Sequence, residues 1–166
     1  MSVIVEPQML NKTFLIRGMG GLTEILCEMA SLLKFKVIVQ TSEEEKERYP
    51  SAAEIITDML ELEDIDFHVD YFILATHHSN DDRISLEALK KGIPYVGVVA
   101  SAKKTGIILE YLKKNGVTEK ELEHFFSPTG LELNAKTPEQ IALSILSEMV
   151  MLENGGSGKQ KKSIIK

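Results

Sequence analysis

The sequence predicts an α/β fold with a doubly wound, mostly parallel sheet, and two observations support this class. Short apolar segments typical of buried strands alternate with longer segments whose apolar residues recur at helical spacing. A glycine-rich turn, Gly18-Met-Gly-Gly21, joins the first such strand to the first such helix. Because strands that alternate with helices form parallel sheets covered on both faces, we expect three layers.

The first half of the chain contains two predicted strands and one predicted helix. Phe14-Leu-Ile-Arg17 is short and apolar, and Lys36-Val-Ile-Val-Gln40 is rich in β-branched residues, as buried strands are. Between them, apolar residues from Leu22 to Leu33 keep helical spacing. A strand, glycine turn, helix and strand in this order begin a Rossmann-like three-layer sandwich. The acidic stretch from Thr41 to Pro50 is predicted to be a solvated loop or a frayed helix.

The second half continues the alternation. Strands are predicted at Asp70–Thr76 and Tyr95–Val99, and the helix between them ends at Lys91 because Gly92 follows as the C′ residue. The last helix has the clearest start, with Thr137 as N-cap, Pro138 at the first position and Gln140 three residues after the cap. Two further helices are predicted, from Ala102 to Asn115 and from the Thr118–Glu121 capping box through Phe125.

Composition bounds the class of protein. A chain of 166 residues with 27% charged residues is typical of one soluble domain, predicted at residues 1–153 with a flexible basic tail at 154–166. A net charge of −6 argues against a nucleic-acid partner. Cys27 is the only cysteine, and no apolar run is long enough to span a membrane. We therefore expect a cytoplasmic protein with no membrane partner.

The glycine turn is a candidate anion site. Gly18 permits a tight turn, Gly20 removes the side chain that would block a phosphate, and Gly21 opens the helix. The free N–H groups at a helix N-terminus then face the anion. The alternative is a glycine turn without a ligand.

Other strand ends contain further candidate residues. Thr76, His77 and Asp82 follow one strand, and His77 is a candidate ligand contact or a structural hydrogen-bonding residue. A metal site is not predicted, because the adjacent His77 and His78 side chains would point in opposite directions. Ser101 and Lys104 begin a helix after the next strand, where a bound anion would offset the unfavourable lysine charge.

A site for NAD(P) is the alternative for the glycine turn. Such a site places an acidic residue about 20 residues further on, but this chain has Gln40, Thr41 and Ser42 there, and Glu43 lies past the strand. Thr41 can make one hydrogen bond to a ligand, without the charge-assisted grip of a carboxylate. An oxidoreductase therefore stays the second hypothesis, and an interaction module without a ligand is the third.

These segments resemble the C-terminal Rossmann-like domain of the XdhC/CoxI family, accessory factors of xanthine dehydrogenase and CO dehydrogenase. The resemblance covers residues 13–150 and includes Gly18-Met-Gly20, Thr76-His77 with Asp82, and Tyr95-Val-Gly97 leading to Ser101 and Lys104. It is most specific from Pro128-Thr-Gly-Leu131 through Thr137 to Ile145. The family pattern often has Asp where Thr41 stands.

The resemblance implies a maturation factor, more a binding protein than an enzyme, that handles the molybdenum cofactor for a molybdenum hydroxylase. The three glycines would take the cofactor phosphate, His77 and Asp82 would face the pterin or metal, and Ser101 and Lys104 would close the anion pocket. Gly130 and Leu131 would form the opposite wall. Family members carry an additional N-terminal domain, so the implied partners are hydroxylase subunits or a separate protein with that domain. A homodimer is also open, because domains of this class often dimerise.

Overall fold

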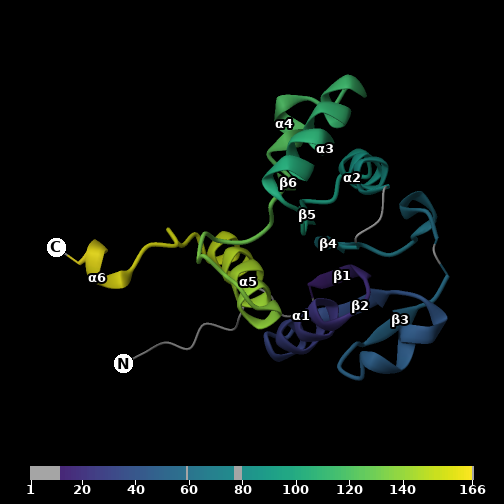
Figure 1. Cartoon of the computed structure of the whole chain (residues 1–166), viewed down its shortest axis with the longest axis horizontal. Helices are drawn as coiled ribbons and strands as arrows, with labels where there is room; N and C mark the ends of the chain where they lie inside the picture. The colour runs from purple at the N-terminus through teal and green to yellow at the C-terminus, as the bar shows by residue number, and fades with distance from the viewer. Residues whose placement is uncertain (1–11, 59, 77–79, 166) are drawn as a thin grey trace.

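A six-stranded parallel sheet lies at the centre of the computed structural model, which describes residues 12–58, 60–76 and 80–165 (Figure 1). The spatial order of its strands is β3-β2-β1-β4-β5-β6. Each described neighbouring pair is parallel. The strands are β1 (Thr13–Gly18), β2 (Lys36–Gln40), β3 (Glu54–Ile56), β4 (Tyr71–Ala75), β5 (Tyr95–Val98) and β6 (Phe125–Phe126).

Helices connect these strands. The longer ones are α1 (Gly21–Leu32), α2 (Asp81–Lys90), α3 (Ala102–Lys114) and α5 (Pro138–Asn154). The shorter ones are η1 (Glu43–Arg48), η2 (Leu62–Asp64), α4 (Glu119–Leu122) and α6 (Lys161–Ile164). The expected caps of α4 and α5 are confirmed, since Thr118 and Glu121 form a capping box and the Thr137 hydroxyl accepts a hydrogen bond from the Gln140 N–H group.

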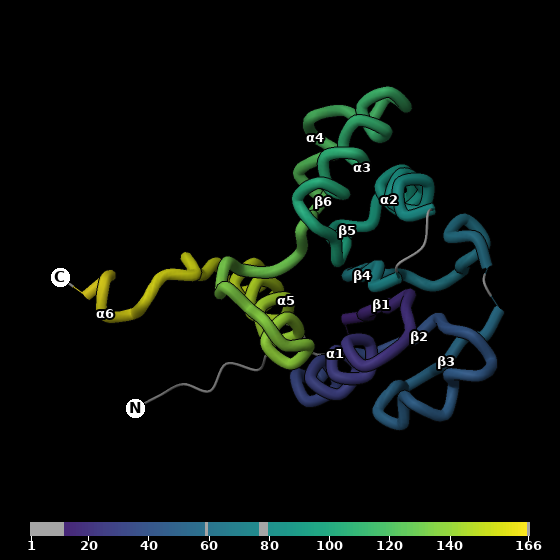
Figure 2. The backbone as a smooth tube through the Cα atoms, in the orientation of Figure 1, coloured from purple at the N-terminus to yellow at the C-terminus, as the bar shows by residue number. Residues whose placement is uncertain are grey.

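Both faces of the sheet are covered, so the predicted three layers are confirmed (Figures 1 and 2). Alternate residues of β1 show this: Phe14 and Ile16 belong to the core under α1 and α5, whereas Leu15 belongs to the core under α2 and α3. Cys27 lies inside the first core, where burial raises the pKa of its thiol to about 11. Its burial indicates a structural thiol.

Three local predictions need correction or addition. The helix from Thr118 does not run through Phe125, because α4 ends at Leu122 and Phe125 begins β6 beside β5. No pattern in the sequence indicated β3, a three-residue strand at the sheet edge. In the segment expected to be a flexible tail the structure has the short exposed helix α6. In the described part of the chain, no helix is long and apolar enough to cross a membrane.

Candidate functional site

The carboxyl ends of β1 and β4 form the centre of the candidate site, because the chain winds outward from β1 in both directions at this point. Ligands of doubly wound folds bind in the crevice where the strand order reverses. Gly18 pairs with Ala75 in the register, so the glycine turn and Thr76 leave the sheet side by side. Thr41 follows β2 at the same edge.

Gly18 is a packing glycine. A Cβ atom at this position would lie 2.6 Å from Thr23 Oγ1 and 3.0 Å from the Ala75 carbonyl oxygen. Thr23 is fully buried and its hydroxyl donates to the Met19 carbonyl oxygen over 3.3 Å. The β-branched side chain of Thr23 therefore fits between strand and helix only because Gly18 has no side chain.

Gly20 and Gly21 form the open part of the turn. Gly20 has a φ of 86°, a conformation that L residues with a side chain rarely adopt, and it is the N-cap of α1. No side chain caps this helix, and a Cβ atom at Gly20 or at Gly21 would meet nothing within 4 Å. The start of α1 therefore has space around its glycines and no side-chain cap, features that suit an anion.

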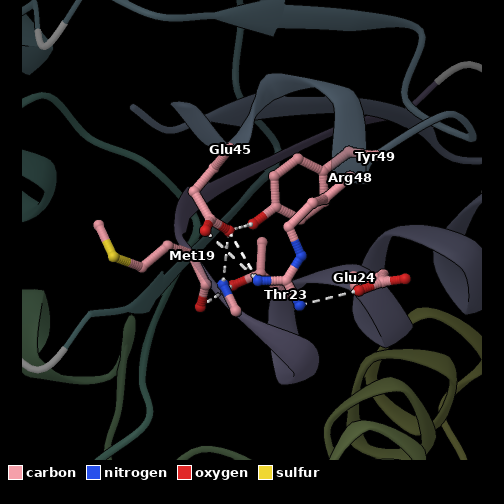
Figure 3. A network of polar contacts seen from close by, with 7 residues as sticks. Met19, Thr23, Glu24, Glu45, Arg48 and Tyr49 are labelled. Carbon is pink, nitrogen blue, oxygen red and sulfur yellow. Dashed lines mark hydrogen bonds and ion pairs between the residues drawn. The ribbon is translucent and has the colours of Figure 1, made fainter. Parts of the chain in front are cut away.

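A carboxylate of the chain itself lies beside this turn (Figure 3). Glu45 Oε2 accepts hydrogen bonds from the Gly20 N–H group over 3.3 Å and from the Tyr49 hydroxyl over 3.1 Å. Arg48 bridges Glu45 and Glu24, with N···O distances of 3.0 and 3.2 Å. The hydrogen bond from Gly20 is the largest of the contributions that lower the pKa of Glu45.

Thr41 lies against the same network. Its side chain is buried, and its hydroxyl has no hydrogen-bond partner among the described residues. It faces the Tyr49 hydroxyl, which donates to Glu45. Thr41 is therefore enclosed beside Tyr49 rather than exposed to the crevice.

On the other side of the crevice, the acidic residue that points inward is Asp81. It is 1% exposed, and its carboxylate accepts from the Thr76 hydroxyl over 2.9 Å and from the Lys104 ammonium. Asp82, the residue expected there, is half-buried and accepts from the Arg83 N–H group over 2.7 Å. The structure thus brings Thr76 and Lys104 together, with Asp81 between them.

The side chains expected to bind an anion at the start of α3 instead bind other groups of the chain. The Lys104 ammonium pairs with Asp81, and the Ser101 hydroxyl accepts from the Lys104 N–H group over 3.1 Å as the N-cap. The Asp81 carboxylate therefore already offsets the lysine charge. His77 and His78 lie outside the described residues.

Gly130 lies in a second turn and packs against α5. Its φ is 109°, a Cβ atom there would lie 2.5 Å from Ser144 Oγ, and its N–H group donates to Glu148 over 3.2 Å. Tyr95 donates to the same carboxylate over 2.7 Å and shares a 2.6 Å hydrogen bond with Thr129. The loop from Pro128 to Ala135 then forms one wall of a hollow of about 430 Å³ beside Ala100.

Arg17 was expected only as a strand residue, yet it is a buried cation at this edge. Nε donates to Gln40 Oε1 over 2.6 Å and Nη2 donates to the Leu60 carbonyl oxygen over 2.7 Å. Gln40 also donates to the Asp58 carbonyl oxygen over 3.0 Å. Burial lowers the pKa of Arg17. These contacts fix the segment after β3 at the rim of the crevice.

Sequence reasoning thus missed Glu45, Tyr49, Asp81 and Arg17. Tyr49 was the available signal for the first two, because an aromatic residue at the end of an acidic stretch indicates that one side of the stretch is buried. Among the described residues, no cluster of His, Cys, Asp and Glu side chains has the geometry of a metal site.

The strand order and the glycine turn define a Rossmann-fold domain. The XdhC Rossmann domain family matches residues 14–149, and the chain belongs to this family. It is 27% identical over 165 residues to the uncharacterised protein YqeB of Escherichia coli, in a match that covers 95% of this chain and 30% of that protein.

The names of two further similar proteins include xanthine dehydrogenase. A probable xanthine dehydrogenase subunit of Bacillus subtilis is 31% identical over 106 residues, 61% of this chain and 30% of that protein. A crystal structure of a xanthine dehydrogenase from Bacillus halodurans superposes with a TM-score of 0.75 at 28% identity, covering 89% of this chain and 44% of that one. The chain spans about 30% of the length of the curated relatives it matches.

Proposed function

We propose that this chain is an accessory protein that binds the molybdenum cofactor through its phosphate during maturation of a molybdenum hydroxylase. The observation that supports it best is the turn at Gly20, where an uncapped helix N-terminus opens onto free space at the switch point of the sheet. Family membership and relatives named for xanthine dehydrogenase support the choice of this cofactor for the proposal. The partners we propose are hydroxylase subunits or a separate protein with an XdhC-type N-terminal domain.

The described residues fit the phosphate end of such a cofactor. The N–H groups of Gly21 and Leu22 at the uncapped start of α1 would hold it. The cofactor supplies the hydroxylase with its redox-active metal, and this chain positions it without turnover. Lys104 is engaged by Asp81, so the proposed phosphate contacts come from the α1 side of the crevice.

Isothermal titration with isolated molybdenum cofactor tests the proposal. Wild-type protein should bind saturably, and Gly20→Val should lose at least about tenfold in affinity because it distorts the turn. Gly106→Ala is the matched control, since a Cβ atom at this helical glycine meets nothing within 4 Å. Absence of saturable binding to the wild type contradicts the proposal.

The second candidate, an NAD(P)-dependent oxidoreductase, gains one observation from the structure. Glu45 lies beside the turn, where the sequence had shown no acidic residue in register. A thermal-shift screen with NAD(H) and NADP(H) tests it, and a rise of several degrees would favour this function over the first.

A further inference from the structure

The hollow of about 430 Å³ beside the loop from Pro128 to Ala135 lies at the carboxyl end of β5. Its apolar lining includes Val99, Ala100, Leu131 and Ile141. Among the described residues that line it, Glu132 is the charged one. A hollow with apolar walls and one charged group is typical of a site for a small organic ring with a polar edge.

The two hydroxyl groups in the lining already have partners within the chain. Thr129 Oγ1 shares a 2.6 Å hydrogen bond with the Tyr95 hydroxyl. Ser144 Oγ donates to the Ile141 carbonyl oxygen over 2.7 Å. Glu132 is therefore the side chain of the lining that is left to recognise the polar edge of a ligand.

The turn after Glu132 holds its carboxylate in place. Oε1 accepts a 3.0 Å hydrogen bond from the Asn134 N–H group, while no described residue donates to Oε2. Asn134 has a φ of 51°, a left-handed conformation that asparagine tolerates better than most residues with a side chain. Each oxygen of a carboxylate can accept two hydrogen bonds. The exposed carboxylate of Glu132 can therefore accept two parallel N–H donors from one ligand, one at each oxygen.

The hollow and the start of α1 lie at the same edge of the sheet. The strands β1, β4 and β5 are neighbours in that order, and all three run parallel. Adjacent strands are about 4.8 Å apart, so roughly 10 Å separates the carboxyl end of β1 from that of β5. A ligand with a phosphate at one end and a ring at the other can therefore reach both places.

We propose that the hollow binds the pterin ring of the molybdenum cofactor and that Glu132 accepts hydrogen bonds from its 2-amino and ring N–H groups. The inference rests on the proposed function, whose phosphate contacts lie at the start of α1, and it adds the place of the ring and the residue that selects it. The two adjacent N–H donors of the pterin edge match the two oxygens of a carboxylate. Guanine presents the same edge, so the experiment includes guanosine.

Fluorescence titration of the full chain with pterin and with lumazine tests this contact. Lumazine has the same fused rings with a carbonyl oxygen in place of the 2-amino group, so an acceptor would face the Glu132 carboxylate. We expect wild-type protein to bind pterin at least about tenfold more tightly than lumazine. In Glu132→Gln this preference should fall to about unity, because an amide both donates and accepts. Glu139→Gln, an exposed residue outside the hollow, should behave as wild type.

Gly20→Val separates the ring contact from the phosphate contact. Pterin has no phosphate, so this variant should bind pterin as wild type does. It should bind isolated molybdenum cofactor at least about tenfold more weakly, as the proposed function requires. Glu132→Gln should weaken the binding of both ligands, and thermal unfolding checks that each variant folds.

The outcomes separate the two proposals. Equal wild-type affinities for pterin and lumazine, or an unchanged preference in Glu132→Gln, overturn the pterin contact alone. Tighter binding of guanosine than of pterin, measured by displacement, also overturns it, since the hollow would then be a site for a guanine base. Pterin binding that depends on Glu132, without any binding of isolated molybdenum cofactor, overturns the proposed function and leaves the contact of Glu132 with the ring standing. Failure of both ligands to bind overturns both.

Discussion

Gly20 and Gly130 both have a positive φ, and the turns that contain them serve opposite purposes. Gly20, with a φ of 86°, has nothing within 4 Å of its absent side chain, whereas Gly130, with a φ of 109°, lies directly against Ser144. The first turn begins a helix that has no side-chain cap. The second uses its N–H group to bind Glu148 of α5. Positive φ alone therefore does not identify a ligand site, and the free space around the glycine decides.

Gly130→Ala tests the packed turn and should have the largest effect. The new Cβ would lie 2.5 Å from Ser144 Oγ and the backbone would be strained as well. We expect a loss of about 3 kcal/mol in the free energy of unfolding, measured in urea. Gly106→Ala should gain up to about 1 kcal/mol. A loss below about 1 kcal/mol at Gly130 would show that Ser144 yields easily and that the contrast with Gly20 is weak.

Tyr95→Phe tests the hydrogen bonds that hold the packed turn. Tyr95 is 2% exposed and donates to Glu148, the same carboxylate that binds the Gly130 N–H group. Burial raises the pKa of Tyr95, so its hydroxyl stays protonated as a donor. We expect a loss of about 1.5 kcal/mol in urea unfolding. The control is Tyr111→Phe, and equal stability of the two variants would remove the role assigned to this contact.

Gly20→Ala tests the open turn. Because no atom obstructs the methyl group, only the positive φ opposes it, and the expected loss in stability is about 1 kcal/mol. Gly21→Ala, in equally open space but inside α1, should keep wild-type stability in the same thermal unfolding measurement. A Gly20→Ala loss as large as that of Gly130→Ala would mean that the first turn is packed too.

The pH dependence of stability should show the smallest effect. The folded-state pKa of Glu45 lies below its ordinary value, so its contribution is present above the unfolded pKa of about 4.3 and is lost as pH falls through the folded pKa. Between about pH 5 and 3, Glu45→Gln should therefore lose less stability than wild type in urea unfolding. Glu44→Gln should follow the wild-type curve, and identical curves for all three would exclude a contribution from the contact with Gly20.

Most helices and central strands could be predicted because their signals are local. Thr137, Pro138 and Gln140 specify the start of α5 within four residues, and Thr118 with Glu121 specifies the start of α4. The strand β6 could not be predicted, because two residues have no periodicity and pair only because β5 lies beside them. The strand β3 depends in the same way on β2.

The candidate site could be predicted in part. Gly20, Thr41 and Thr76 follow strands of a parallel sheet, so their common edge follows from the fold class. Which acidic residue points inward could not be predicted, since Asp81 and Asp82 are neighbours and only the packing of α2 against α3 buries Asp81 beside Lys104. Glu45 lies in η1, 25 residues after Gly20, and contacts it only because η1 packs beside the glycine turn.

The sequence by itself determined the central strands, the longer helices, the doubly wound class and the location of the glycine turn, because apolar periodicity, caps and glycines act over a few residues. Only the tertiary structure decided which side chains meet in the crevice. Contacts such as Glu45 with Gly20 and Asp81 with Lys104 depend on how separate elements pack, and packing selects among residues that are alike in sequence.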